Sequence, residues 1–513
     1  MSAPKILFKR KVVLLALCLL VAGASVYLGC SSKPQPRTVQ DDIVDGKALA
    51  AKYCQSCHQL PEPALIDKIS WERGVLPAMG KRLGISTYMG QYYAQNGSAL
   101  NVVEWQRIVT YFTQTAPDSL VIPKPAVAPL TDMAHFTVKQ PADTTNHGMP
   151  GMTTYIGFDT ISHKLYTGDA MGNLLSWDSN LKSTLVQKMP SPVTGAIFSV
   201  GKGVFTCIGQ MMPVDESKGK LIELSLPSPK KQIVYTDSLP RAVQSVAADF
   251  NKDGLIDYVT CGFGHDRGGV FLLTQQKDHS FKKTSVRPIP GGTQMVTGDF
   301  NNDGWPDVMC LFAQADEGIW MFLNDHKGGF ETKNVLHFPA VYGSSSFQLV
   351  DFNHDGKPDI LYTCGDNSDF SKVLKPYHGV YIFTNQGDWK FKQTYFYRID
   401  GATKAVAADF DHDGDLDIAV IAFFADFKFH PGEGFTYLEQ TGQNKFTAHQ
   451  LPIQRYGRWL TMEVGDVNHD GYPDVILGNF STAGRGLLNQ SGFQPKWNQN
   501  EPIILLQNGF GKK

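Results

Sequence analysis

Short apolar runs alternate with polar turns through the last three quarters of the chain. Residues 245–248 (SVAA) and 258–263 (YVTCGF), for example, flank a turn rich in aspartate and glycine. Runs of about four to eight apolar or β-branched residues between turn signals have the length of buried strands. This pattern predicts an all-β region built from many short strands.

The alternation is organised in repeats. Five segments share one pattern, Asp-x-Asn/Asp-x-Asp-Gly-x-x-Asp, apart from the residues at x, and they begin at residues 249, 299, 351, 409 and 466. Successive starts are therefore 50 to 58 residues apart, which is the length of one four-stranded propeller blade. Residues 153–187 and 195–237 keep the strand rhythm without the acidic turn, which brings the number of predicted blades to seven.

The last repeat is one strand short, because the chain stops soon after the apolar run at residues 502–506. The isolated strand-like segment at residues 135–140 (HFTVKQ) precedes the first complete repeat. If it supplies the missing strand, the ring closes without a free sheet edge. We therefore expect a seven-bladed β-propeller over residues 134–513.

The acidic turns have the chemistry of calcium sites. Side-chain oxygens at positions 1, 3, 5 and 9 suit a hard cation, glycine at position 6 allows a sharp turn, and position 7 offers its carbonyl. The turns lack the glutamate that an EF-hand carries at position 12, and strands flank them instead of helices. Acidic turns without metal are the alternative, but most would then hold three unneutralised aspartates close together. About five Ca²⁺ ions are predicted, with these ligands: Asp249, Asn251, Asp253, Leu255, Asp257, Asp299, Asn301, Asp303, Trp305, Asp307, Asp351, Asn353, Asp355, Lys357, Asp359, Asp409, Asp411, Asp413, Asp415, Asp417, Asp466, Asn468, Asp470, Tyr472 and Asp474.

The repeats resemble the FG-GAP/VCBS repeats of integrin-α-type β-propellers. That resemblance implies that each ion braces the turn between the first two strands of a blade.

The first 29 residues have the features of an export signal. A basic start is followed by an apolar run from Val12 to Gly29 and then by a Gly-Cys-Ser-Ser sequence. This resembles a bacterial lipoprotein signal, in which Cys30 is the lipidated first residue of the mature chain and residues 30–40 form a tether. The alternative is an uncleaved membrane anchor. Both predict an extracytoplasmic, membrane-anchored protein in the periplasm or at the cell surface, and Ser31 after the cysteine favours the outer membrane.

Residues 54–58 read Cys-Gln-Ser-Cys-His, which is the attachment pattern of a c-type haem. Cys54 and Cys57 would bind the porphyrin covalently, and His58 would be an axial ligand of the iron. A thioredoxin-like redox pair is one alternative, but it requires a preceding strand, whereas residues 45–53 favour a helix. A zinc site is another, but no second Cys or His pair follows at zinc spacing.

Two features downstream complete a small haem domain. Met79 lies in a Pro-x-Met-Gly segment that we expect to be a loop, and it is the predicted second axial ligand, with Met89 as the weaker candidate. Asn101 and Glu104 predict a capping box, and apolar residues at helical spacing follow it up to about residue 116. Residues 41–118 thus resemble an all-α, class I mono-haem cytochrome c domain. Residues 119–133 are a Pro-rich linker.

The remaining composition narrows the possible functions. Cys207, Cys261, Cys310 and Cys364 lie in apolar, strand-like runs, so we expect buried thiols and not disulfides. A formal charge of −2 and no long basic block after residue 11 argue against nucleic-acid binding. No hydrolase elbow, phosphate loop or dinucleotide fingerprint is present.

The whole chain resembles tethered bacterial proteins in which a mono-haem cytochrome c domain precedes FG-GAP/VCBS repeats. The resemblance implies electron transfer to a redox partner protein, with the propeller as a docking or ligand-binding module. Two alternatives stay open: a haem-coupled dehydrogenase, and a surface adhesion or glycan-binding lipoprotein. The propeller face opposite the acidic turns is the expected ligand face, with these candidate residues: His265, Arg267, His378, His430, Arg455, Tyr456 and Trp459.

Overall fold

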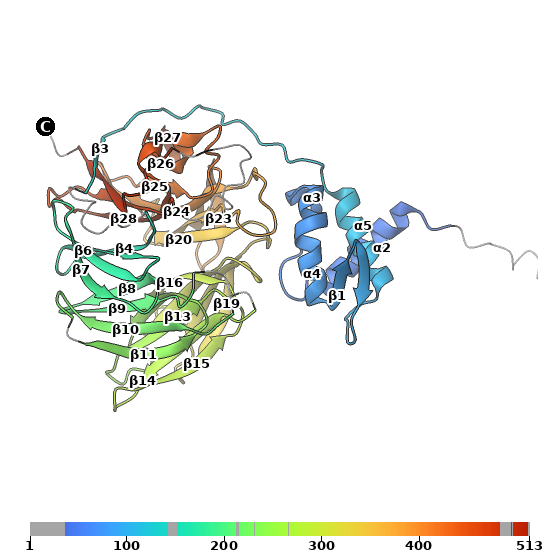
Figure 1. Ribbon diagram of the computed structural model, residues 1–513, viewed down its shortest axis with the longest axis horizontal. Helices are drawn as coiled ribbons and strands as arrows, with labels where there is room; N and C mark the ends of the chain where they lie inside the picture. The colour runs from blue at the N-terminus through green and yellow to red at the C-terminus, as the bar shows by residue number, and fades with distance from the viewer. Residues whose placement is uncertain are drawn as a thin grey trace, which may run out of the picture.

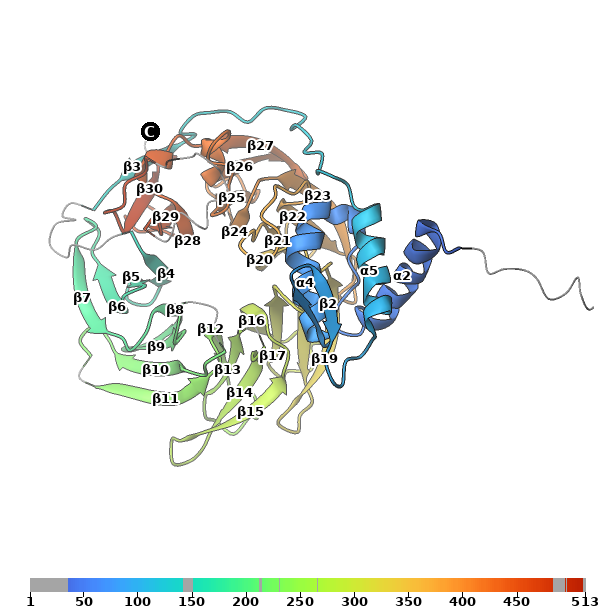
Figure 2. The same cartoon turned by 45° about the vertical axis from the view of Figure 1, so that its right-hand side comes forward.

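A computed structural model describes residues 36–141, 151–211, 215–229, 231–264, 266–482, 494 and 496–510. The predicted export signal, Cys30 and His265 lie outside these residues. The described chain forms a small N-terminal part with helices and a ring of seven four-stranded sheets (Figures 1 and 2). Among the described helices, none has the length and apolar character needed to cross a membrane.

Each sheet of the ring is an antiparallel blade, and in six of the seven blades neighbouring strands follow one another along the chain. The first blade comprises β4 (Thr153–Asp159), β5 (Lys164–Asp169), β6 (Asn173–Trp177) and β7 (Ser183–Lys188), and the second β8 (Val193–Ser199), β9 (Lys202–Cys207), β10 (Gly219–Ser225) and β11 (Gln232–Leu239). The third comprises β12 (Ala242–Ala248), β13 (Asp257–Gly262), β14 (Gly269–Gln275) and β15 (Phe281–Arg287), and the fourth β16 (Gly292–Gly298), β17 (Asp307–Phe312), β18 (Gly318–Asn324) and β19 (Phe330–His337). The fifth comprises β20 (Ser344–Val350), β21 (Asp359–Cys364), β22 (Gly379–Asn385) and β23 (Phe391–Arg398), and the sixth β24 (Ala402–Ala408), β25 (Asp417–Ala422), β26 (Phe435–Gly442) and β27 (Lys445–Gln450).

The seventh blade closes the ring as the sequence predicts. Its strands are β28 (Trp459–Gly465), β29 (Asp474–Asn479), β30 (Ile503–Asn508) and β3 (Phe136–Lys139). β3 pairs antiparallel with β30, with Phe136 opposite Asn508 and Lys139 opposite Leu505. The two ends of the propeller sequence therefore share one sheet, and the seven-bladed architecture is confirmed.

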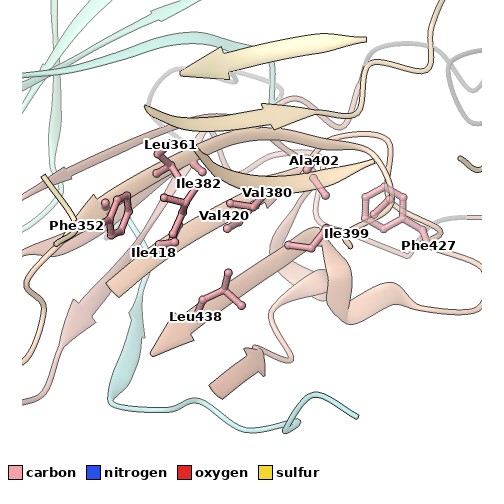
Figure 3. Packing of buried hydrophobic residues seen from close by; sticks show 14 of the residues in the cluster. Phe352, Leu361, Val380, Ile382, Ile399, Ala402, Ile418, Val420, Phe427 and Leu438 are labelled. Carbon is pink, nitrogen blue, oxygen red and sulfur yellow. The ribbon is translucent and has the colours of Figure 1, made fainter. Parts of the chain in front are cut away.

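Apolar side chains fill the space between blades. Between the fifth and sixth blades, Leu361, Ile382, Ile418 and Val420 form part of one buried cluster (Figure 3). The second strand of each acidic repeat is buried along its whole length, whereas the outermost strands expose many positions. The four propeller cysteines are buried and free, as predicted: Cys207, Cys261, Cys310 and Cys364.

The N-terminal part contains two main helices, α2 (Val39–Tyr53) and α5 (Val102–Thr115), which pack together. Both begin with a capping box: Thr38 with Asp41, and Asn101 with Glu104. The second box is the one that the sequence predicts. Between the two helices the chain forms η1 (Pro63–Leu65), α3 (Lys68–Ser70), the π-helical turn η2 (Trp71–Val75), α4 (Leu76–Arg82) and the strands β1 (Ile85–Tyr88) and β2 (Gln91–Ala94).

This part is not all-α as we expected, because β1 and β2 form a hairpin. Tyr88 pairs with Gln91, so Met89 and Gly90 are the only turn residues, and both have positive φ, 47° and 75°. Two consecutive residues with positive φ define the turn type that matches the twist of a hairpin. The aromatic and β-branched residues on both sides of the turn favour strands.

Gly46 lets helices α2 and α5 approach closely. A Cβ atom on Gly46 would lie 2.1 Å from the carbonyl oxygen of Arg107 and 2.8 Å from Cβ of Tyr111. We expect Gly46→Ala to destabilise the N-terminal part by about 1–3 kcal/mol, because the helices must separate to admit the methyl group. Thermal unfolding followed by far-UV circular dichroism measures this. The neighbouring exposed variant Lys47→Ala is the control, and equal stability of the two variants would contradict the prediction.

The linker is anchored to the propeller at its far end. Leu130 exchanges backbone hydrogen bonds with the edge strand β27: its N–H donates to Ala448 O (2.8 Å), and its carbonyl accepts from Gln450 N–H (2.8 Å). His449 lies between Asp132, 2.8 Å from Nδ1, and Glu439, 3.1 Å from Nε2. Residues 130–132 are therefore fixed on the sixth blade.

Candidate functional site

The Cys-x-x-Cys-His segment directly follows helix α2. Cys54 caps the helix, its N–H donating to Ala50 O (2.8 Å), and is half-buried, whereas Cys57 is exposed. Burial raises the pKa of the Cys54 thiol to about 11. Both thiols are free in the structure, so both remain available for thioether formation.

The His58 ring is oriented by a backbone carbonyl. Its Nδ1 lies 2.9 Å from Gln59 O, and because a carbonyl only accepts, Nδ1 carries the hydrogen in this contact. The lone pair of the neutral ring is then on Nε2. Metal-binding histidines are typically held in this way, with the other nitrogen donating to a carbonyl. His58 is thus set up as a ligand through Nε2.

The structure corrects our expectation for Met79, which lies in helix α4 and not in a loop. Pro77 is near the start of this helix, directly after the π-helical turn η2, within a helical run that is continuous over residues 68–82. Met79 is partly buried and packs against the same apolar cluster as Cys54. Met89 is 85 % exposed at the tip of the β1–β2 hairpin. Of the two predicted methionine ligands, only Met79 shares this cluster with the first cysteine.

Trp105 adds a polar group that the sequence did not single out. Its side chain is 1 % exposed, and its Nε1–H has no hydrogen-bond acceptor among the described residues. An unpaired buried donor costs about 1–3 kcal/mol, so such a group normally has a partner. A carboxylate of a haem bound in this part would be a suitable acceptor. The residues around the motif therefore fit a haem.

The N-terminal part contacts the propeller on the face opposite the acidic turns (Figures 1 and 2). The Tyr377 hydroxyl of the fifth blade lies 3.1 Å from Leu65 O. The backbone of Phe370 lies against Gly74, where an added Cβ would be 2.1 Å from Phe370 O. Arg82 forms an ion pair with Asp266 of the third blade, at 2.7 Å. The N-terminal part, which contains the Cys-x-x-Cys-His segment, is therefore in direct contact with this propeller face.

On the opposite face, the acidic turns share one backbone geometry. The glycine at position 6 has a φ of 80° to 96° in all five turns, and in four of them an added Cβ would meet nothing within 4 Å. Glycine is therefore needed for the left-handed backbone and not for space. In the third blade Asp253 N–H donates to Asp249 Oδ1 (3.1 Å) and to Asn251 Oδ1 (3.0 Å). The side chains of positions 1, 3 and 5 thus gather around the turn.

The aspartate at position 9 has a second role that the sequence analysis missed. Asp257 is fully buried, and its two carboxylate oxygens accept from Phe250 N–H (3.2 Å) and from Gln275 N–H (2.9 Å). Asp307, Asp359 and Asp474 make the equivalent bonds. Burial raises the pKa of Asp257 to about 6. The position-9 carboxylate therefore links each turn to the third strand of its blade by hydrogen bonds. Each of its two oxygens has a further lone pair with which it could bind an ion.

The sixth blade gives the best case for a bound cation. Carboxylate oxygens of Asp409, Asp411 and Asp413 lie within 4.8 Å of one another. The buried Oδ1 of Asp409 has no partner among the described residues. Burial and the neighbouring carboxylates raise the pKa of Asp411. An all-oxygen set with excess negative charge fits Ca²⁺.

Of the residues predicted for the ligand face, the structure exposes some and buries others. Arg267, His430 and Arg455 are exposed and Tyr456 is half-buried, as a surface role requires. His378 and Trp459 are each 1 % exposed, so their prediction as surface residues is wrong. Trp459 fills the apolar cluster between the sixth and seventh blades, and His378 is buried at the start of β22.

The propeller side of the predicted ligand face also holds buried acidic residues that the sequence did not predict. No motif among their neighbours in the chain distinguishes them from surface acids. Glu317 of the fourth blade is 1 % exposed, and its side chain accepts a hydrogen bond (2.6 Å) from the N–H of Ser344 in the adjacent fifth blade. Burial raises its pKa to about 8. Asp400 and Glu433 are similarly buried on the neighbouring sixth blade.

Glu317 makes the stability of the propeller depend on pH. The unfolded chain loses this proton near pH 4.5 and the folded chain near pH 8, so the folded state binds more protons between these values. The free energy of unfolding is therefore expected to fall as pH rises through this window, by on the order of 1–3 kcal/mol from this group. Glu317→Gln should flatten that part of the curve in urea unfolding at pH 5 to 8. Parallel curves for the wild type and the variant would contradict the prediction.

Comparisons with known proteins agree with the repeat geometry. A family model for an FG-GAP-like repeat matches residues 249–310, 299–362 and 373–420. Integrin alpha-3 of Cricetulus griseus is 30 % identical over 125 residues, which is 20 % of this chain and 12 % of that protein. A T-cell immunomodulatory protein homolog of Plasmodium falciparum is 23 % identical over 157 residues, 29 % of this chain and 21 % of that protein.

This chain thus spans only a small part of the length of these relatives. Among solved structures, the Neurospora crassa Pan2 WD40 domain is similar with a TM-score of 0.44 and 10 % identity, covering 74 % of this chain and 97 % of that one. The fold assignment here rests on the strand pairing itself. The chain contains FG-GAP-like repeats in a seven-bladed β-propeller, a fold consistent with a ligand-binding or docking module.

Proposed function

We propose that this protein is an extracytoplasmic electron-transfer protein that carries one covalent haem c beside a calcium-braced docking propeller. The observation that carries the proposal is the Cys54–Cys57–His58 motif, in which Nδ1 of the histidine donates to the Gln59 carbonyl, so that the lone pair of the neutral ring is on Nε2. The predicted signal and Cys30 support a membrane tether outside the cytoplasm.

Each residue of the N-terminal part has a definite role in this proposal. Cys54 and Cys57 would anchor the haem, and His58 and Met79 would be the axial ligands. The Trp105 N–H would donate to a haem carboxylate. A haem held between imidazole and thioether supplies reversible one-electron transfer at a raised potential.

The propeller would then serve as the surface on which a redox partner docks. Its polar loops carry exposed Arg267, His430 and Arg455 on the side to which the N-terminal part is attached. A partner bound there would lie close to the helical part that carries the haem motif. We propose about five Ca²⁺ ions on the other side as braces of the turns.

The test is to produce the full chain in a host that matures c-type cytochromes and to record its pyridine haemochrome. One covalent haem per chain is expected for the wild type and for the buried-thiol control Cys207→Ala. Cys54→Ser together with Cys57→Ser should leave no covalent haem. A colourless wild-type protein from such a host would contradict the proposal.

A second candidate is a haem-coupled dehydrogenase, favoured by the buried acids Glu317, Asp400 and Glu433 on the propeller side that the helical part contacts. It predicts that a sugar or alcohol substrate reduces the haem with no other protein present. Reduction only by a protein donor would favour the docking function. Adhesion or glycan binding, the remaining alternative, predicts ligand binding that survives Met79→Ala.

A further inference from the structure

A cluster of three metal-ligating side chains lies on the sixth blade, away from the acidic turns. Asp400 is in the connection between β23 and β24, and His430 and Glu433 are in the loop between β25 and β26. One ligand atom from each residue lies within 4.8 Å of the others. The two segments meet only because the outer strand of the fifth blade leads into the inner strand of the sixth.

The carboxylates of this cluster are deeply buried. Asp400 is 0 % and Glu433 7 % exposed, and Oε2 of Glu433 has no hydrogen-bond partner among the described residues. Ile399, Ala402 and Phe427 lie together at the neighbouring end of the apolar cluster between the fifth and sixth blades (Figure 3). A carboxylate oxygen in such surroundings, without a partner, is costly unless a proton or a cation is bound to it.

Charge balance favours a cation. Asp400, Asp426 and Glu433 are three buried carboxylates, and Arg398 is an arginine paired with one of them: its Nη2 lies 2.6 Å from both carboxylate oxygens of Asp400. His430 Nδ1 is 3.5 Å from Asp426 Oδ2. With all three carboxylates ionised and the imidazole neutral, the group would carry two negative charges in excess, which one divalent ion would neutralise.

We propose that Asp400, His430 and Glu433 bind a divalent transition-metal ion such as Zn²⁺ or Mn²⁺. The imidazole distinguishes this site from the acidic turns, because Ca²⁺ prefers oxygen ligands only, whereas transition metals accept nitrogen. Arg398 and Asp426 would hold Asp400 and His430 in place, as hydrogen-bonding groups around metal ligands commonly do.

The site is open on one side. The His430 side chain is 58 % exposed, so solvent reaches the metal position past the imidazole. Three protein ligands leave coordination positions for water or for a ligand, as in catalytic zinc sites. The cluster lies on the same side of the propeller as the contacts with the helical part. This inference does not depend on haem attachment.

The experiment measures Zn²⁺ binding to the full-length protein in excess Ca²⁺, so that the acidic turns are saturated. Equilibrium dialysis with metal analysis should give one Zn²⁺ per wild-type chain. Glu433→Gln, which keeps the side-chain volume, should lower the affinity at least tenfold, and so should His430→Asn. His279→Asn, an exposed histidine on a turn of the third blade, is the matched control and should bind as the wild type does.

Unaltered Zn²⁺ binding in both Glu433→Gln and His430→Asn would overturn the proposal, and so would a wild type that binds no Zn²⁺ under these conditions. Equal thermal melting of the metal-free proteins shows that the variants fold. If the chain carries no haem, Zn²⁺ bound at Cys54, Cys57 and His58 persists in both variants and is lost in Cys54→Ser. A failure of the proposed metal site can therefore be distinguished from a failure of the proposed haem attachment.

Discussion

Chelation of Ca²⁺ is expected to lower the melting temperature of the propeller by more than about 10 °C. A ligand present at 100 times its dissociation constant stabilises the folded state by about 2.7 kcal/mol. Five turns of the same geometry would each bind one Ca²⁺, so their contributions to the free energy of unfolding add up. Without the ions, the aspartates gathered in each turn, at positions 1, 5 and 9 and in the sixth blade also at position 3, repel one another. Residues 41–118 contain no such acidic turn, so the optical spectrum of the N-terminal part should change little on chelation. Calorimetry with and without chelator measures the effect.

Substitution in one turn gives the control for this prediction. Asp413→Asn in the sixth blade should reduce the calcium content by one ion per chain. Asp325→Asn should not, since Asp325 lies in the β18–β19 turn and accepts from the N–H groups of Lys327 (2.8 Å) and Gly329 (2.9 Å). A melting curve that is the same in chelator would show that the turns hold no metal in the folded protein.

Replacing Met79 by leucine is expected to lower the reduction potential of the haem by on the order of 0.1 V or more. Loss of the thioether removes the ligand that favours ferrous iron, whereas leucine keeps most of the side-chain volume in the apolar cluster. Spectroelectrochemical titration of the wild type and the variant measures the shift.

Met89→Leu is the matched control, because Met89 is 85 % exposed at the hairpin tip. It should leave the potential unchanged. A shift in Met89→Leu together with an unchanged potential in Met79→Leu would reverse the assignment of the axial ligand.

Features carried by neighbouring residues were predictable from the sequence. The Asp/Asn-Gly turns, the strands around them and the capping box of α5 each depend on residues within about ten positions of one another. The closing strand was also predictable, because a repeat that is one strand short must find a partner for its edge. The Cys54–His58 motif is also local in sequence, and haem attachment at it stays a prediction.

The sequence did not predict the helix around Met79. Pro77 and Gly80 are typical loop residues, yet Pro77 directly follows the π-helical turn η2 within a continuous helical run. Gly80 packs against Trp105, where an added Cβ would lie 2.9 Å from the indole ring. The helical conformation of this segment therefore depends on tertiary packing and not on local sequence preference. The hairpin after it, with Met89 and Gly90 at positive φ, follows a local rule that the sequence analysis overlooked.

By itself, then, the sequence determined the acidic turns and the blade count, because short-range spacing specifies both, and it determined the closure of the ring, because one repeat is a strand short. Only the tertiary structure decided which distant side chains meet and which are buried. It buried His378 and Trp459, directed each position-9 aspartate toward the third strand, and brought Asp400 to His430 and Glu433. These outcomes depend on the pairing of strands within a blade and on the packing of one blade on the next, and residues 18 or more positions apart carry no local sign of either.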